Sequence, residues 1–228
     1  MRNSEKTPVV TFPARLPLFY YITDRTSLPG QNLFERIQLI VDWGADFVQI
    51  REKNMTEHDL FEVTARAVAL ARRTRCRVLV NGRADIALAA GAAGVHLTST
   101  GLRPPDIASW LPEDFLVGVS AHSVREAARA ARQGADYVLL GPVYATPSKT
   151  AYGPPIGLSV LRRACTRVSL PVLGLGGIGV QQIDSVLRAG AAGIAGISLF
   201  QNQLPCLGGD SAELRRRLAR SRPLSEIQ

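Results

Sequence analysis

The chain has 228 residues, of which 46% are hydrophobic, and a formal net charge of +8 at pH 7. This length suits one large domain or two small ones, and the hydrophobic fraction is ordinary for a globular protein with a substantial core. No apolar stretch approaches the roughly 20 residues that a membrane span needs. No segment directs the chain out of the cytoplasm, so we expect a cytoplasmic protein without a membrane partner.

The positive charge raises the question of nucleic-acid binding, and the cysteines raise that of disulfide bonds or a metal site. The arginines are scattered among predicted helices without an aromatic stacking platform, so we interpret them as solvated helix faces and expect no nucleic-acid partner. A nucleic-acid patch is the alternative, and an anionic substrate would also be served by the positive field. Cys76, Cys165 and Cys206 are odd in number and far apart, which predicts neither a disulfide framework nor a metal site.

Four similar segments recur along the chain, beginning at Gly44, Gly91, Gly134 and Gly190. In each, the glycine ends an amphipathic stretch and β-branched residues begin an apolar run. With the apolar runs between them, the pattern predicts eight strands, in chain order 18–23, 46–51, 77–81, 94–97, 116–120, 136–140, 171–175 and 193–198.

Helical patterns separate these strands, for example over residues 33–43, 57–73, 123–133 and 180–189. Short apolar strands that alternate with helices predict a parallel sheet covered on both faces, and eight such units predict a single (β/α)₈ TIM barrel. A doubly wound open sheet is the alternative, but no GxGxxG follows the first strand. We expect the barrel to span residues 16–221, between a flexible N-terminal segment (1–15) and a tail (222–228).

Polar residues gather where the strands end, which is where such barrels place their active sites. Gln49, Arg51 and Lys53 share one face of the second strand, and a basic pair beside an amide suits a phosphate or diphosphate. Both cations could instead pair with nearby acids, such as Glu52 or Asp24.

The third and fifth strands end in side chains that could serve either a ligand or the fold. Asn81 could bond a heteroaromatic ring or cap the next helix. His122 opens the loop after the fifth strand, where a histidine could act as a general acid–base, and Ser123 is typical of a helix N-cap. His96 lies inside the fourth strand, and we interpret it as a satisfied core residue.

Loops after the last three strands suit an anion. Thr146, Ser148 and Lys149 lie in a Gly/Pro-rich loop, which predicts a mobile anion-binding lid, with an ordinary polar loop as the alternative. Glycine-rich runs end strands seven and eight, whose loops form the usual phosphate site of these barrels. The residues predicted to bind phosphate are Gly176, Gly177, Ile197 and Ser198.

Several stretches in the right order resemble the thiamine phosphate synthase and thiazole tautomerase superfamily over nearly the whole of residues 18–200. They are YYITDR (20–25), GADFVQIREK (44–53), GVHL (94–97), GVSAHS (118–123), GADYVLLGPVYATPSK (134–149), GLGGI (174–178) and GISLF (196–200). The superfamily fold is a (β/α)₈ barrel, which agrees with the independent count of strands. Its synthases join a pyrimidine diphosphate to a thiazole phosphate, and its tautomerases convert a dihydrothiazole carboxylate phosphate into the aromatic thiazole.

The resemblance implies roles for the residues at the strand ends. Those that would face the pyrimidine diphosphate are Gln49, Arg51, Lys53, Asn81, Ser120 and Lys149. Thr146 and Ser148 would contact ligand in the lid. Gly177, Ile197 and Ser198 would hold the thiazole phosphate.

Two positions depart from the synthase pattern. Synthases carry magnesium-binding aspartates directly after the strand-three asparagine and four residues after the GVHL-like stretch, whereas this chain has Gly82 and Gly101 there. Asp85 and Asp106 lie nearby but would more simply sit near helix N-termini. Loss of both ligands resembles the tautomerase branch, which also has VNGR after strand three.

We therefore predict a thiazole tautomerase that binds a thiazole phosphate, needs no metal or other cofactor, and uses His122 as its acid–base group, as that branch does with the corresponding histidine. A magnesium-dependent thiamine phosphate synthase is the first alternative, because Gln49, Lys53 and the Thr-Pro-Ser-Lys lid are synthase-like. A non-catalytic protein that binds thiazole or thiamine phosphates is the second. The sequence leaves the oligomeric state open, a homo-oligomer included.

Overall fold

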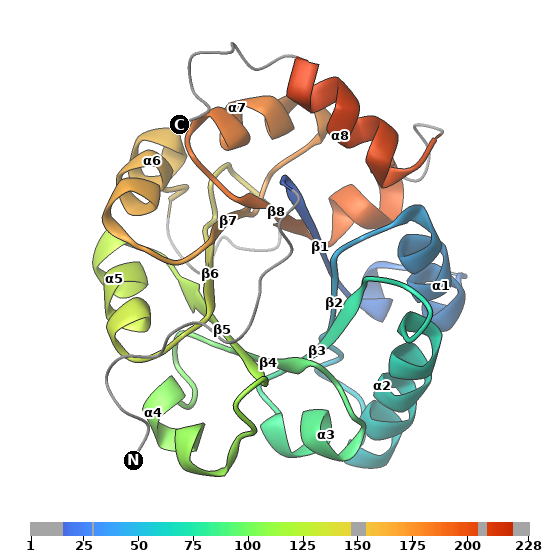
Figure 1. Ribbon diagram of the computed structural model, residues 1–228. Helices are drawn as coiled ribbons and strands as arrows, with labels where there is room; N and C mark the ends of the chain where they lie inside the picture. Colours follow the sequence, from blue (N-terminus) through green and yellow to red (C-terminus); the bar gives the residue numbers. More distant parts are fainter. Residues whose placement is uncertain (1–15, 29, 147–153, 205–208, 221–228) are drawn as a thin grey trace.

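The computed structural model describes residues 16–28, 30–146, 154–204 and 209–220, and in them eight parallel strands close into a barrel in chain order. Figure 1 looks along the barrel and shows the strands as an inner ring. The strands are β1 Leu18–Ile22, β2 Phe47–Ile50, β3 Arg77–Asn81, β4 Gly94–Leu97, β5 Leu116–Ala121, β6 Tyr137–Leu140, β7 Val172–Leu175 and β8 Gly193–Gly196. The predicted (β/α)₈ barrel is confirmed, while the expected terminal segments, 1–15 and 222–228, lie outside the described residues.

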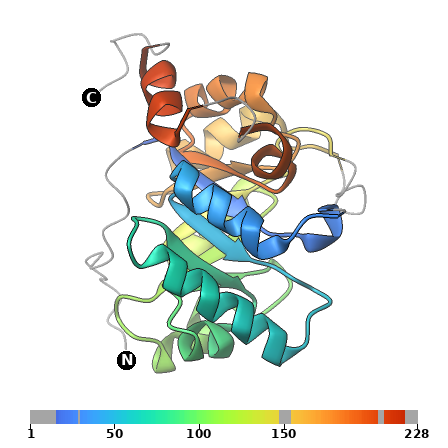
Figure 2. The ribbon, with the colours of Figure 1, turned by 90° about the vertical axis from the view of Figure 1, so that its right-hand side faces the viewer.

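Helices cover the outside of the barrel, and Figure 2 shows α1 (blue) and α2 (teal) lying across the strands. The α-helices are α1 Leu33–Trp43, α2 Glu57–Ala71, α3 Ala84–Ala89, α4 Pro104–Ile107, α5 Val124–Arg132, α6 Gly157–Arg167, α7 Ile183–Arg188 and α8 Ser211–Arg220. Shorter turns are the 3₁₀ helices η1 Arg25–Ser27, η2 Ala108–Trp110 and η4 Val180–Gln182, and the π-helix η5 Leu199–Gln203. In the part of the chain that is described, no helix is both long and apolar enough to cross a membrane.

The helix ends follow from local sequence. Asn32, Thr56 and Ser123 precede α1, α2 and α5, and the side chain of each accepts a hydrogen bond from a backbone N–H in the first turn. Ser123 is thus the N-cap that the sequence predicts. Gly44 ends α1 with φ of 97°, a left-handed conformation that a residue with a side chain rarely adopts.

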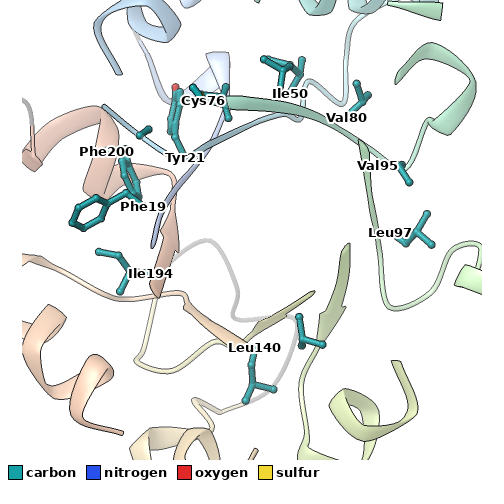
Figure 3. Packing of buried hydrophobic residues seen from close by; sticks show 14 of the residues in the cluster. Phe19, Tyr21, Ile50, Cys76, Val80, Val95, Leu97, Leu140, Ile194 and Phe200 are labelled. Atoms are coloured by element: carbon teal, nitrogen blue, oxygen red, sulfur yellow. The ribbon is translucent and has the colours of Figure 1, made fainter. Parts of the chain in front are cut away.

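Two apolar layers arise because successive side chains of a strand point to opposite faces. The outer layer lies between strands and helices, and Figure 3 shows members of it, such as Phe19, Tyr21 and Phe200. The inner layer fills the barrel and consists of Leu18, Tyr20, Ile22, Phe47, Leu79, Leu116, Tyr137, Leu139, Leu173 and Ala195. The barrel is therefore a packed core, which leaves its carboxyl-terminal mouth as the place for a site.

A buried ion pair joins α8 to the amino-terminal end of the barrel, which is the end opposite the mouth. Asp46, just before β2, accepts a hydrogen bond from the Phe19 backbone N–H at 2.8 Å and pairs with Arg215. Arg215 also donates to the Pro17 carbonyl at 3.0 Å and the Ser211 hydroxyl at 2.7 Å, and its guanidinium lies 4.5 Å from the centre of the Phe19 ring. Because each charge is hydrogen-bonded several times, the pair can remain buried.

Candidate functional site

Hydrogen bonds between inward-facing side chains cross the barrel just below its mouth. The Tyr20 hydroxyl of β1 donates to Gln49 Oε1 of β2 at 2.9 Å. The same amide donates through Nε2 to Asn81 Oδ1 at the end of β3, also at 2.9 Å. On its other side, the Tyr20 hydroxyl lies 2.8 Å from the hydroxyl of Tyr137, which comes from β6.

The hydrogen bonds continue from Tyr137 to the fifth strand. The Tyr137 hydroxyl lies 3.1 Å from His96 Nδ1, and His96 Nε2 lies 2.8 Å from Ser120 Oγ. His96 comes from β4 and Ser120 from β5. We call the whole series the interior chain, and its members in order are Asn81, Gln49, Tyr20, Tyr137, His96 and Ser120.

The middle of the interior chain is buried and its two ends are not. Tyr20, Tyr137, Gln49 and His96 are at most 2% exposed, while Asn81 and Ser120 are partly exposed. Burial raises the pKa of the Tyr20 phenol well above its ordinary value, with a further contribution from Tyr137, and burial likewise raises the pKa of Tyr137. Both hydroxyls therefore keep their hydrogens near neutral pH.

Gly118 makes room for this arrangement. A Cβ at Gly118 of β5 would overlap the phenol ring of Tyr137, which comes from the neighbouring β6. The glycine thus allows the Tyr137 hydroxyl to reach the centre of the barrel.

The structure tests several predictions made for these residues from the sequence. It brings Gln49, Asn81 and Ser120 together, as their positions at strand ends suggest. The capping alternative for Asn81 is wrong, because its Oδ1 accepts from Gln49 and α3 begins after Arg83 without a side-chain cap. His96 is confirmed as a hydrogen-bonded core residue.

Sequence reasoning missed the two tyrosines of the interior chain. Tyr20 and Tyr137 lie in apolar runs, and their bulky rings are typical of a core. The available signal was position: an inward-facing hydroxyl inside a barrel needs a hydrogen-bond partner when it is buried.

The two cations after β2 form no ion pair with the nearby acids in the described part of the chain. The carboxylate of Glu52 instead accepts two hydrogen bonds from the Arg25 backbone N–H, at 3.1 and 3.2 Å, and lies 4.0 Å from the Arg25 side chain. Arg51 is partly exposed and Lys53 is exposed. Among the described residues, neither positive charge is therefore neutralised by Glu52 or Asp24.

The loops after β6 and β7 pack closely together. Gly176 and Gly177 have φ of 92° and 66°, and a Cβ at Gly177 would lie 2.5 Å from the Ala145 carbonyl oxygen and 2.6 Å from that of Tyr144. The β7 loop can therefore lie against the β6 loop only because position 177 has no side chain. Of the predicted lid residues, Thr146 is partly buried, and Ser148 and Lys149 lie outside the described residues.

The two remaining residues predicted to hold phosphate follow β8, which pairs with β7. Ile197 is partly exposed, and Ser198 is exposed at the start of η5. They are thus next to the β7 loop in the barrel, on the side where loops of such barrels commonly bind phosphate.

His122 lies outside the interior chain, and its contacts are with residues that follow β4, β5 and β6. Its Nδ1 is 2.5 Å from the Gly141 carbonyl oxygen, its Nε2 is 3.4 Å from Ser99 Oγ, and its backbone N–H donates to Glu126 at 2.8 Å. It also lines a cavity of 580 Å³ that is bordered by α5, α6 and residues 154–156. The structure thus places His122 beside α5 and α6, whereas Gln49, Asn81 and Ser120 share the barrel interior.

The two positions of the superfamily's magnesium-binding aspartates do not fit a metal ion in this chain. Gly82 and Gly101 offer no side-chain oxygen, and magnesium prefers carboxylate oxygens. In the residues that are described, no group of three or more His, Cys, Asp or Glu side chains could hold a metal ion.

The two neighbouring aspartates are held elsewhere. Asp85 lies in the first turn of α3 and pairs with Arg83 at 2.7 Å, and Asp106 lies in α4 and pairs with Arg103 at 2.9 Å. The arginine in each pair lowers the pKa of the carboxyl. Each carboxylate therefore has a role at a helix N-terminus, as the sequence suggests.

Comparison with known proteins places this chain in a family. The family described as thiamine monophosphate synthase matches residues 19–200. The thiamine-phosphate synthase of Roseiflexus castenholzii is 37% identical over 192 residues, 84% of each protein, and that of Methanoculleus marisnigri is 39% identical over 179 residues, 78% of this chain and 85% of the relative. The solved structure of thiamine phosphate pyrophosphorylase from Pyrococcus furiosus has a TM-score of 0.78 and 29% identity, covering 89% of this chain and 96% of its own.

The prediction of a thiazole tautomerase, an isomerase with His122 as its acid–base group, is wrong. The relatives are named for thiamine-phosphate synthesis, which is a transferase reaction. The prediction depended on the glycines at positions 82 and 101, and an absent side chain does not specify a different reaction.

Proposed function

The chain belongs to the thiamine monophosphate synthase family, and we propose that it is a thiamine-phosphate synthase, which joins a pyrimidine diphosphate to a thiazole phosphate. The observation that carries the proposal is the similarity to synthases over most of both proteins. In this reaction a bond forms between the thiazole and the methylene carbon attached to the pyrimidine as the bond from that carbon to the diphosphate oxygen breaks, and diphosphate leaves with the electron pair of the broken bond.

We assign the pyrimidine diphosphate to the half of the mouth formed by β2, β3 and β5. Arg51 and Lys53 supply positive charge there, and neither pairs with Glu52 or Asp24 among the residues that the structure describes, which supports this role. Asn81 and Ser120 are the exposed ends of the interior chain and offer polar contacts, and Gln49 holds Asn81 in place. Lys149 would complete the set.

No step is assigned to a metal ion, because Gly82 and Gly101 do not supply the ligands that the family pattern requires. Charge that develops on the departing diphosphate is instead offset by the side chains around it, and Arg51 suits this task because its planar guanidinium can bind two phosphate oxygens at once.

We assign the thiazole phosphate to the loops after β7 and β8. Gly176 is partly exposed and Gly177 is exposed, and neither has a side chain that would shield its backbone N–H from an anion, while Ser198 adds a hydroxyl. Ile197 would contact the same phosphate group, while Thr146 and Ser148 would cover it from the β6 loop.

Growth of a bacterial strain that lacks its own thiamine-phosphate synthase tests this function. The strain should grow without added thiamine when it expresses the wild-type chain. Ser198→Asp places a negative charge where we locate the phosphate and should abolish growth. Ser198→Asn is the control, because asparagine has nearly the same shape as aspartate without the charge, and it should support growth. Failure of a folded, well-expressed wild-type chain to support growth would contradict the proposal.

A further inference from the structure

The number of hydrogens on each side chain determines in which direction the hydrogen bonds of the interior chain are donated. A hydroxyl has one hydrogen, and a neutral imidazole has one N–H. Tyr20 donates its hydrogen to Gln49 Oε1, so it accepts from Tyr137. Tyr137 then has no second hydrogen to give, so it accepts from an N–H on His96 Nδ1. In neutral His96 the other nitrogen, Nε2, is therefore an acceptor, and the Ser120 hydroxyl donates to it.

Because the hydrogen bonds run in this direction, the two partly exposed ends of the interior chain, Asn81 and Ser120, are chemically different. Asn81 Oδ1 accepts from Gln49, so the groups that Asn81 can offer to a ligand are its amide N–H groups. The hydrogen of Ser120 points inward to His96, so Ser120 presents only lone pairs. An ionised phosphate oxygen accepts hydrogen bonds and cannot donate them, so it suits Asn81 but is mismatched with Ser120.

We propose that His96 resolves this mismatch by taking up a proton on Nε2 when a phosphate oxygen binds to Ser120. The hydroxyl of Ser120 then turns toward the anion, and without further change its oxygen would face the lone pair of Nε2 at 2.8 Å. A proton on Nε2 restores that hydrogen bond and leaves the bond from Nδ1 to Tyr137 intact. His96 contacts Ser120 and not the ligand, so it is a positioning residue.

The surroundings of His96 support uptake that depends on the anion. The titratable groups whose rings pack against it are Tyr20 and Tyr137, with ring centres 6.4 and 5.7 Å away, and burial keeps both phenols neutral. Asn81 and Ser120, its neighbours on β3 and β5, are also neutral. A buried imidazolium ion is costly without an opposite charge nearby. Bound diphosphate supplies that charge, because only the side chain of Ser120 separates it from His96.

The inference rests on the proposed function, in which the anion at Ser120 belongs to a diphosphate. It also gives the site a source of positive charge in a chain that lacks both aspartates of the family's metal site. The positive charge would exist only while the anion is bound, and it would be lost when diphosphate leaves.

Nitrogen NMR of the histidine rings tests the proposal directly. Inorganic diphosphate is added to the ¹⁵N-labelled wild-type protein at about pH 7.5, where an ordinary imidazole is mostly neutral. The chain has three histidines, so His58→Gln and His122→Gln identify the signals of His96. We expect His96 to carry a hydrogen only on Nδ1 in the free protein and on both nitrogens when diphosphate is bound. Hydrogen on Nε2 in the free protein, or a bare Nε2 in the complex, would overturn the proposal.

Calorimetric titration of diphosphate adds a second readout. The wild type should take up protons on binding, measured as heat that depends on the buffer, and Ser120→Ala should lose the uptake that comes from His96. His96→Gln can still donate to Ser120 but carries no charge. Since charge-assisted hydrogen bonds are roughly twice as strong as neutral ones, its diphosphate Kd should rise roughly tenfold.

Failure of this proposal can be told from failure of the proposed function. If diphosphate binds and His96 stays neutral, the proton uptake is refuted while the synthase function stands. If diphosphate does not bind the wild-type protein, both the diphosphate site and the proton uptake are refuted.

Discussion

Tyr137→Phe should destabilise the protein, because it removes one hydroxyl from the middle of the interior chain and keeps the ring. That hydroxyl has two partners, Tyr20 at 2.8 Å and His96 at 3.1 Å. A hydrogen bond contributes about 1 kcal/mol net, and a buried group left without a partner costs about 1–3 kcal/mol. The N–H of His96 loses its acceptor, so we expect the free energy of unfolding to fall by about 2–4 kcal/mol.

This loss is large enough to measure by calorimetry and by urea unfolding. At about 2.1 cal/mol/K per residue, unfolding of a chain of this length has an entropy of about 0.5 kcal/mol/K, so Tm should fall by about 4–8 °C. Tyr21→Phe is the matched control, since Tyr21 is buried on the outer face of β1 and its hydroxyl accepts one bond, from Gln201 at 3.1 Å. It should lose about half as much.

A double substitution tests whether the two tyrosines act as one unit. Tyr20→Phe and Tyr137→Phe each remove the hydrogen bond between the two hydroxyls, so their combined loss should be smaller than the sum by about 1 kcal/mol. Strictly additive losses, or a Tyr137→Phe protein within about 0.5 kcal/mol of the wild type, would refute the hydrogen-bonding scheme.

Three further outcomes follow from other parts of the molecule. Asp46→Ala leaves the buried charge of Arg215 without its partner and should lower the free energy of unfolding by about 3–5 kcal/mol in urea; a loss below about 1 kcal/mol would contradict this. Burial raises the pKa of Cys76 to about 12 and that of Cys165 to about 11, so at about pH 8 iodoacetamide should modify these two thiols only after unfolding, and rapid labelling of either one in the native protein, located by peptide mapping, would be the contrary result. Thiazole phosphate should raise the Tm of wild type and Ser198→Asn but not of Ser198→Asp, and equal shifts in all three would move the phosphate site elsewhere.

Much of the barrel could be predicted because each strand and helix carries its own local signal. The predicted bounds of β3, β4 and α1 agree with the structure. Strand β8 was predicted to reach Ser198, but its pairing with β7 ends at Ala195, since β7 itself ends at Leu175. The predicted helix over 180–189 is divided into η4 and α7, where Gln182 accepts a hydrogen bond from the Gly179 N–H.

The site was predictable only in part. Their positions at strand ends place Gln49, Asn81 and Ser120 toward the mouth, and that expectation needs only local sequence. The contact between Tyr20 and Tyr137 joins residues 117 positions apart, and it requires the space that Gly118 leaves on β5, the strand beside that of Tyr137. Such a meeting depends on the register of the closed barrel, which a local pattern does not specify.

Product formation by the purified protein tests the proposed function most directly. The chain is incubated with the pyrimidine diphosphate and the thiazole phosphate, thiamine phosphate is measured by chromatography, and diphosphate is measured after hydrolysis to phosphate. We predict equal amounts of thiamine phosphate and diphosphate, and a much lower rate for Arg51→Met, which retains the apolar stem of the side chain without its charge. A folded wild-type protein that binds diphosphate but forms no thiamine phosphate from the two substrates would contradict the assignment.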